Sequence, residues 1–217
     1  MATLPAPHSL SRDQLNLLHE PVDRALARSA EVLSEMSGVS IAFSTCTIEM
    51  VALAEVPTAV GNPGDPAIGI YVGMEGDGSG YVLLLMDESI AVQLAALMLG
   101  EDASTIELTD ELPASALAEA GNVACSQFMN EVGDATGLEL MAMPPVVVGD
   151  MRGAILDVAI ADIAQLGDDA LLITTQLGPE SALAGSDGLL NLRLLVIPTP
   201  DTLMALLDAL DSKAKGE

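Results

Sequence analysis

The sequence predicts an α/β (α+β) fold in which two pseudo-symmetric helix–strands–helix halves share one sheet that is flanked by long helices. Three observations predict it. Helical and strand periodicities follow one another in the same order twice along the 217 residues. A shift of 99 residues superposes the leading segments of the two halves without a gap. Hydrophobic residues make up 50% of the chain, which is enough for a sizeable core.

The first half opens with an amphipathic helical pattern over residues 11–37, which ends before Gly38. Gly76-Asp77-Gly78 has the composition of a tight turn between two strands. In chain order the pattern predicts a strand, a Gly- and Pro-rich loop, two strands and a short apolar helix, over residues 39–56, 61–66, 67–74, 80–86 and 89–99.

The second half repeats this order, beginning with a helix over residues 110–136. After it come a strand, a segment with both helical and strand signals, two strands and a closing helix, over residues 138–148, 154–165, 170–177, 189–197 and 201–210. The 99-residue shift places Glu119 on Glu20 and Gly137 on Gly38. We therefore expect a single domain over residues 1–217, with half-repeats of about 11–100 and 110–210 and leading helices related by a pseudo-two-fold axis.

The charge of the chain is strongly negative. Seven Lys and Arg residues stand against 32 Asp and Glu residues, for a net charge of -25. Such a surface cannot neutralise a nucleic-acid backbone, and an anionic membrane would repel it. Two interpretations of the acidity remain open: it has a role in partner choice, or it serves only solubility or a high-salt cytoplasm. Apolar runs are far shorter than the ~20 residues of a membrane span and no secretory signal is visible, so we expect a cytoplasmic protein without membrane insertion.

The sequence contains no recognisable metal-binding pattern. Cys46 and Cys125 fit neither a metal nor a disulfide spacing, and His8 and His19 lack partners at ligand spacing. We expect no cofactor to be bound by this chain. The 11 methionines, beside two Phe and two Tyr, indicate either an adaptable core or an interface.

A polar stripe runs along the helix predicted over residues 110–136. At about 100° per residue, Ser115, Glu119 and Asn122 lie on one line, which Ser126 extends. Gly121 sits in mid-helix at a cost of ~1 kcal/mol relative to Ala, which indicates that something approaches the backbone closely there. The opposite side of the helix carries residues that can pack, namely Leu117, Ala120 and Phe128. A polar stripe alone is typical of a solvated surface, but these features favour a functional site.

The spacing of this stripe matches a known pattern. Ser-x3-Glu-x2-Asn-x22-Pro is satisfied by Ser115, Glu119, Asn122 and Pro145. It resembles the motif of the CheC/CheX/FliY phosphatases, which hydrolyse the aspartyl phosphate of the chemotaxis regulator CheY. The length and the two-half layout are similar to those of CheC, so the resemblance covers most of the chain.

The resemblance implies a role for each residue of the motif. The amide of Asn122 orients the attacking water, and Glu119 anchors the regulator by pairing with a lysine near the phosphorylated aspartate. Ser115 and Pro145 shape the site. The expected partner is a phosphorylated CheY-like response regulator, which itself holds Mg²⁺, and a CheD-like deamidase is a further candidate. The alternative is a non-catalytic docking module that binds a response regulator, a CheD-like deamidase or a flagellar-switch component.

The first half carries a degenerate copy of the motif. The 99-residue shift aligns the four motif positions with Asn16, Glu20, Asp23 and Cys46. Members similar to CheC often have two active sites, but Asp23 would bring a carboxylate toward an anionic phosphoryl group. Pro21 is also better suited to a helix start than to a helix interior. We therefore expect this copy to be inactive.

Overall fold

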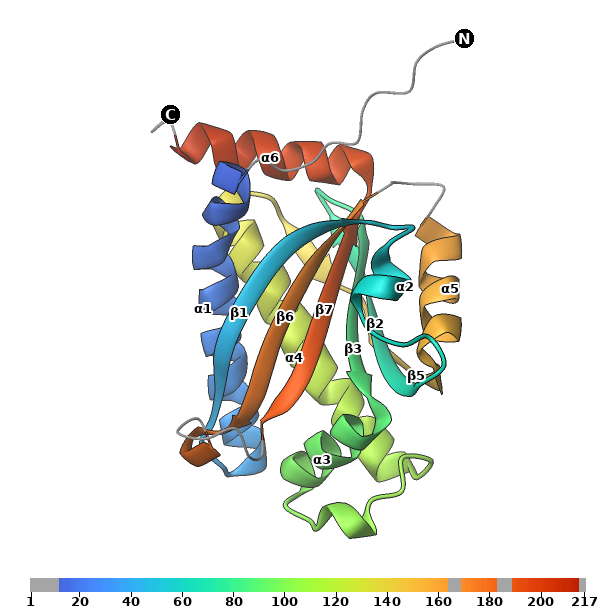
Figure 1. The fold of residues 1–217 in the computed structure, drawn as a ribbon. Coiled ribbons are helices and arrows are strands. Elements are labelled where there is room, and N and C mark those ends of the chain that lie inside the picture. Colours follow the sequence, from blue (N-terminus) through green and yellow to red (C-terminus); the bar gives the residue numbers. More distant parts are fainter. Residues whose placement is uncertain (1–11, 164–168, 183–188, 215–217) are drawn as a thin grey trace.

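The computed structural model describes residues 12–163, 169–182 and 189–214 (Figure 1). The helices are α1 (Arg12–Ser37), α2 (Val56–Ala59), α3 (Glu88–Leu99), α4 (Glu111–Thr136), α5 (Arg152–Ile163) and α6 (Pro200–Ala214), with short 3₁₀ turns at Ala103–Thr105 and Glu180–Ala182. The strands are β1 (Ile41–Ala52), β2 (Pro66–Gly76), β3 (Gly80–Asp87), β4 (Leu140–Ala142), β5 (Val146–Met151), β6 (Asp169–Pro179) and β7 (Leu190–Pro198).

The strands form one antiparallel sheet in the order β1-β6-β7-β3-β2, with β4 and β5 both paired to β2 at the far edge. This order is symmetric about its centre. β7 and β3 form the middle pair, β6 and β2 flank them, and β1 on one edge corresponds to β4 and β5 on the other. The prediction of two pseudo-symmetric halves that share one sheet is confirmed, and α1 and α4 hold equivalent places in it.

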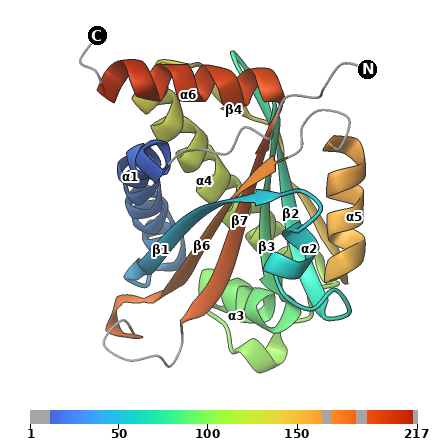
Figure 2. The same cartoon turned by 45° about the horizontal axis from the view of Figure 1, so that its top comes forward.

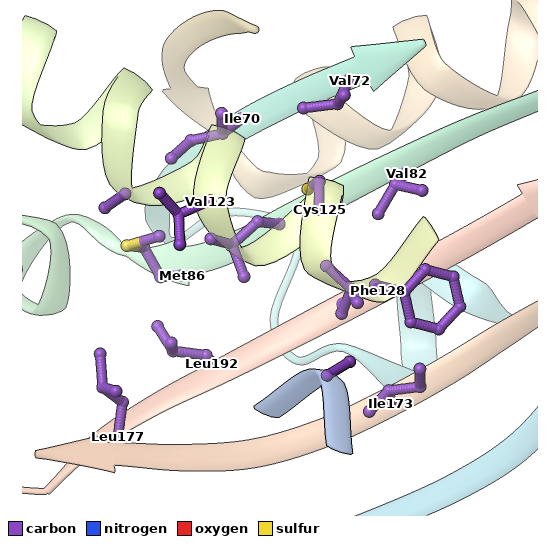
Figure 3. Close-up of a cluster of buried hydrophobic side chains, with 14 of the residues drawn as sticks. Ile70, Val72, Val82, Met86, Val123, Cys125, Phe128, Ile173, Leu177 and Leu192 are labelled. Atoms are coloured by element: carbon purple, nitrogen blue, oxygen red, sulfur yellow. The ribbon is translucent and has the colours of Figure 1, made fainter. Parts of the chain in front are cut away.

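Helices cover both faces of the sheet. α1 and α4 lie on one face, with α3 and α6 at its two ends, and α2 and α5 lie on the other (Figures 1 and 2). Alternate side chains of each strand point to opposite faces. In β3, Val82 and Leu84 enter the larger core beneath α1 and α4, whereas Leu83 and Leu85 enter the smaller core beneath α2 and α5. Figure 3 shows part of the larger core, where α4 packs on the sheet through residues such as Phe128.

The two long helices agree with the sequence prediction almost to the residue, although residue 11 lies outside the described residues. Each helix has 26 residues and ends at a glycine in the left-handed region, Gly38 with φ 70° and Gly137 with φ 78°. The amide of Gly38 donates to the carbonyl of Ser34, and that of Gly137 to Gly133. Glycine adopts this conformation without steric cost, so the local sequence determines where both helices end.

Some predicted boundaries are wrong. The strand predicted over residues 138–148 is two strands, β4 and β5, because Pro144 and Pro145 cannot donate backbone hydrogen bonds and interrupt the ladder. The equivalent strand β1 shifts register at the matching place, between Phe43 and Cys46. β1 also ends at Ala52, before the short helix α2. The ambiguous segment 154–165 is helical as far as Ile163, and its last two residues lie outside the described part.

Candidate functional site

The polar stripe of α4 faces outward. Ser115 and Glu119 are exposed, and Asn122 and Ser126 are partly buried. The opposite side of the helix is buried through Leu117, Ala120 and Phe128. Residues three apart on a helix are neighbours on its surface, so Glu119 and Asn122 are presented together. The outward orientation inferred from the sequence is therefore correct.

Neither functional group of the pair is engaged strongly by its own chain. Within the described residues, Glu119 forms no ion pair or hydrogen bond. The position one turn further along α4 is Val123, which cannot pair with it. The hydroxyl of Ser126 donates to Oδ1 of Asn122 over 3.5 Å, a distance at which such a bond is weak. Both side chains therefore remain free to bind a group from outside.

Gly121 allows α4 to approach the sheet closely. A Cβ atom at this position would lie 2.6 Å from Cγ2 and 2.8 Å from Cδ1 of Ile70 in β2. Real carbon atoms do not approach so closely, so only glycine fits without a shift of Ile70. The close approach that the sequence indicated is therefore made by the chain's own sheet. Gly121 fixes the depth at which the neighbouring Asn122 is held.

Pro145 directly precedes β5, a strand that contacts α4. Val147, two residues later in β5, pairs with Ile70, the residue on which Gly121 packs. Val147 also packs against the larger core, on the side of the sheet that α4 covers. Pro145 itself is partly buried in the break between β4 and β5.

Known proteins resemble this chain in the region of the site. The family model "Chemotaxis phosphatase CheX" matches residues 68–165, a range that contains all four motif positions. A curated relative, "CheY-P phosphatase CheC" of Bacillus subtilis (strain 168), is 24% identical over 176 residues, which are 80% of this chain and 84% of the relative. The chain is therefore similar in sequence to chemotaxis phosphatases of the CheX and CheC kind.

Solved structures share the fold. FliY of Thermotoga maritima superposes on this chain with a TM-score of 0.75 at 16% sequence identity. The superposition includes 94% of this chain and 98% of the FliY chain. The middle domain of FliM from H. pylori superposes with a TM-score of 0.64 at 9% identity, over 92% of this chain and 99% of its own. At these identities the likeness concerns architecture only.

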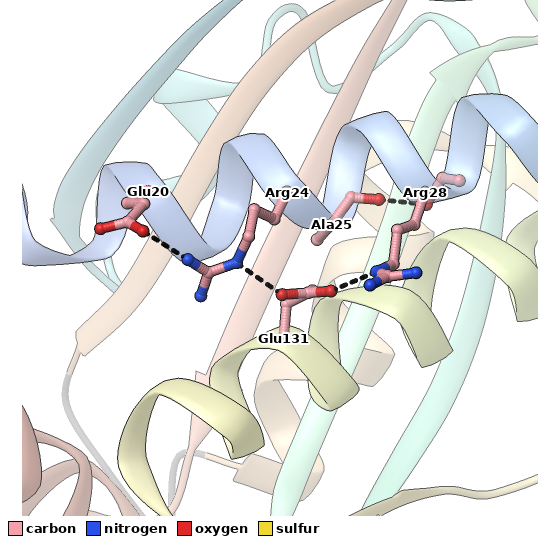
Figure 4. Close-up of polar contacts among 6 residues, drawn as sticks. Glu20, Arg24, Ala25, Arg28 and Glu131 are labelled. Carbon is pink, nitrogen blue, oxygen red and sulfur yellow. Dashed lines mark hydrogen bonds and ion pairs between the residues drawn. The ribbon is translucent and has the colours of Figure 1, made fainter.

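The first-half copy of the CheC/CheX/FliY motif is arranged differently. Asn16, Glu20 and Asp23 are exposed on α1, whereas on α4 Ser115 and Glu119 are exposed and Asn122 is partly buried. However, Glu20 accepts a hydrogen bond from Nη1 of Arg24, one helical turn away (Figure 4). The carboxylate that corresponds to the free Glu119 is therefore already paired within its own helix.

Arg24 also links α1 to α4 through an ion pair. Nε of Arg24 donates to Oε2 of Glu131 at 2.7 Å, and Nε of Arg28 donates to Oε1 at 2.6 Å (Figure 4). Glu131 is only 4% exposed, and the hydrogen bond from Arg24 holds the pKa of this carboxyl below its usual value, with a further contribution from Arg28. The one sign of this network in the sequence is the spacing of two arginines four residues apart on α1, which does not reveal their partner across the helix pair.

The charge of Asp23 acts on Cys46. Burial and, to a smaller extent, the negative charge of Asp23 together raise the pKa of the Cys46 thiol to about 11. The residues aligned with Asn122 and Pro145 are thus near neighbours at the α1 site, with a carboxylate and a thiol in place of the amide and the proline.

The expectation about Pro21 is wrong. Pro21 lies inside α1 and not at its start. An interior proline removes one backbone hydrogen bond. α1 continues through it because Pro21 and its neighbour Val22 are buried on the apolar face of the helix. The inactivity expected of this copy therefore depends on Asp23 and on the pairing of Glu20, and not on a helix boundary.

A buried arginine stabilises the region that follows β5. Arg152 is 3% exposed, and its Nη1 donates to the carbonyl of Asn62 at 2.8 Å and to Oδ2 of Asp65 at 3.4 Å. Its Nη2 donates to Asp87, at the end of β3. Arg152 is the single basic residue between Arg28 and Arg193 in the sequence. The surface around the polar stripe therefore carries no exposed cation of its own from that stretch.

Among the residues that the structure describes, no group of three or more His, Cys, Asp and Glu side chains is placed to hold a metal ion. Nor does any described helix combine the length and apolar character needed to cross a membrane. Cys125 is fully buried, and burial raises its pKa to about 12, so it is a core residue and not a nucleophile.

Proposed function

We propose that this chain hydrolyses the aspartyl phosphate of a phosphorylated CheY-like response regulator. The observation that carries the proposal is that Glu119 and Asn122 lie side by side on the outward stripe of α4. Glu119 is exposed there and, within the described residues, forms no ion pair or hydrogen bond. A convex helix surface, and not a deep pocket, suits a substrate that is itself a protein. Similarity to the CheX phosphatase model and to the CheY-P phosphatase CheC supports the same proposal.

In the proposed reaction, water attacks phosphorus and the bond between phosphorus and the aspartate oxygen breaks. The products are inorganic phosphate and the free aspartate carboxylate. An acyl phosphate is already activated, and the regulator supplies the Mg²⁺, so the phosphatase need not provide a metal or a nucleophile. The amide of Asn122 has no useful pKa and cannot act as a general base. Its contribution is to hold the attacking water in line with phosphorus, as the glutamine of GTPases does.

Glu119 has a separate role in this proposal. Its carboxylate pairs with a lysine of the regulator near the phosphorylated aspartate. An exposed ion pair contributes only about 0.2–1 kcal/mol on its own, but it fixes the orientation in which two proteins meet. Glu119 is available for this because residue 123 is valine, whereas Glu20 is occupied by Arg24. Ser115 and Pro145 border the pair and shape the surface on which the regulator rests.

The alternative is a docking module that binds a regulator, a CheD-like deamidase or a flagellar-switch component without turnover. A multiple-turnover assay separates the two. A purified CheY-like regulator is phosphorylated with acetyl phosphate, the donor is removed, and release of phosphate is followed with this chain at one-fiftieth of the regulator concentration. We expect phosphate release to accelerate by at least tenfold. A rate equal to that of the regulator alone, with binding retained, supports the docking module instead.

A further inference from the structure

A groove lies between α4 and the edge strand β5. Its volume is about 470 Å³. Ala114 and Leu117 of α4 form one wall, Val147 and Gly149 of β5 form the other, and Ile68 of β2 contributes to the floor. The lining provided by these residues is apolar.

The groove is formed by elements that also bear on the proposed site. Ala114 directly precedes Ser115, and Leu117 lies one turn before Gly121 on α4. On the other wall, Val147 follows Pro145 by two residues. The groove is therefore built from the helix that carries Glu119 and Asn122 and from the strand that directly follows Pro145.

The first half of the chain provides an internal comparison. The 99-residue shift that aligns the two motifs places Ala114 on Leu15 and Gly149 on Met50. Both larger residues pack against the core of the molecule. The other wall residues change little, since Leu117 corresponds to Leu18 and Val147 to Ile48. Small residues thus open the groove in the half with the intact Glu119–Asn122 pair, and large residues occupy these positions in the half where the pair is degenerate.

The rim of the groove is acidic. Glu88 and Asp150 line it and are exposed. The single basic residue of the chain between positions 28 and 193 is Arg152, which is buried and paired with Asp65 and Asp87. No exposed lysine or arginine between positions 28 and 193 therefore neutralises the acidic rim. An occupant that combines an apolar side chain with a neighbouring lysine or arginine complements both the floor and the rim.

We propose that the groove is a specificity pocket of the docking surface, which receives a large apolar side chain of the response regulator flanked by a basic residue. This inference rests on the proposed function. It assigns to Ala114 and Gly149 a role in binding the regulator and none in the chemical step. Filling the groove therefore weakens association, while the turnover of a bound regulator is preserved.

The experiment uses the full chain with Asn122→Ala as background, so that the regulator stays phosphorylated while it is titrated. Ala114→Leu and Gly149→Met, tested singly, fill the groove with the residues that the first half carries at these positions. Both are compatible with the fold. Leucine favours a helix, and a Cβ at position 149 lies 3.1 Å from Cδ1 of Ile68, the flexible end of that side chain. Ala54→Leu, in the exposed turn after β1, adds equal bulk elsewhere and serves as control.

The dissociation constant of fluorescently labelled, phosphorylated CheY-like regulator is measured for each variant. Each filled variant should bind about 10- to 100-fold more weakly than the control, which corresponds to the loss of one buried apolar side chain. In the chain with Asn122 restored, KM should rise and kcat should stay within twofold. Dissociation constants within twofold of the control for both filled variants overturn the pocket. The rate of the chain with Asn122 present tests the proposed function independently. A chain that binds the phosphorylated regulator but does not accelerate phosphate release refutes that function and leaves the ratio of dissociation constants unaffected.

Discussion

Two glutamates at equivalent positions of equivalent helices differ in one neighbour. Glu20 is followed one turn later by Arg24, which binds it, and Glu119 by Val123, which does not. An ion pair of this kind on a helix contributes only about 0.3–0.5 kcal/mol to stability. Its larger consequence is functional, since a carboxylate that is already paired must break that pair before it binds a lysine of another protein.

The contact between Gly121 and Ile70 leads to a prediction about stability. Gly121→Ala gains up to about 1 kcal/mol of helix propensity but forces a methyl group against Ile70, and overpacking typically costs about 1–3 kcal/mol. We expect a net loss of about 1 kcal/mol in the free energy of unfolding. Ile70→Ala removes the side chain that the new methyl group meets. It should therefore lower the free energy of unfolding by at least about 1 kcal/mol less in the Gly121→Ala background than in the wild type.

Urea denaturation of the four proteins of this double-mutant cycle measures the coupling. Gly64→Ala is the matched control, because a Cβ at that exposed position meets nothing closer than 3.9 Å. It should leave stability nearly unchanged. Additivity of Gly121→Ala and Ile70→Ala within about 0.5 kcal/mol contradicts the proposed contact.

At the scale of elements, α1 and α4 are joined by a charged contact as well as by the core. Glu131 bridges Arg24 and Arg28 across the helix pair, and its pKa is lowered chiefly by the hydrogen bond from Arg24 (Figure 4). A carboxyl whose pKa is lower in the folded than in the unfolded state stabilises the fold above its unfolded pKa of about 4.3. That stabilisation is lost as the pH falls through the folded pKa.

This arrangement predicts a difference in acid sensitivity. Glu131→Gln should lower the free energy of unfolding at pH 7 by about 1–2 kcal/mol, since it loses two charged hydrogen bonds whose arginine partners are partly solvated. It should also flatten the decline in stability between pH 6 and pH 3. Denaturant midpoints across that range measure both effects, with Glu119→Gln as the unpaired control. If the free energy of unfolding declines equally with pH in Glu131→Gln and in the wild type, the contact of Glu131 with Arg24 and Arg28 is not a source of stability.

Elements were predictable from sequence where their determinants are local. The long helices follow from apolar periodicity and from terminal glycines such as Gly38 and Gly137, so their bounds agree with the structure. The division of residues 138–148 into β4 and β5 depends on prolines whose effect appears only once a partner strand is present. The segment 154–165 carried mixed signals because α5 buries one side on the sheet and exposes Val158 on the other.

At the scale of the whole molecule, the two halves keep one architecture and have diverged in surface. The 99-residue shift was sufficient to predict two equivalent halves that share one sheet, because matched spacing places matched elements in the same order. The Arg24–Glu131–Arg28 network and the groove beside Ala114 are formed by residues that are distant in sequence. Sequence spacing therefore could not predict them. The same shift does show the small-for-large changes at positions 114 and 149, but without a structure nothing relates them to a cavity.

The net charge of -25 bears on the stability of the whole chain. Like charges on a compact surface repel, and salt screens them as the Debye length falls from about 30 Å at 0.01 M to about 3 Å at 1 M. We expect Tm to rise with NaCl over that range and the affinity for the regulator to fall. A thermal melt and a binding titration at each salt concentration measure the two trends. Affinity that is independent of salt contradicts a role of the acidity in partner choice and leaves solubility or a saline cytoplasm as its reason.

The central claim is that one site, the Glu119–Asn122 pair on α4, performs the reaction. Decay of a phosphorylated CheY-like regulator, present in excess, is followed with wild type, Asn122→Ala and Asp23→Ala. Asn122→Ala should lose roughly 100-fold in rate, the cost expected when the attacking water is no longer oriented, and should change stability by less than about 1 kcal/mol. Asp23→Ala, at the equivalent place on α1, should turn over at the wild-type rate. A loss in Asp23→Ala as large as that in Asn122→Ala contradicts the single-site account, and wild-type rates in both variants contradict catalysis by the motif.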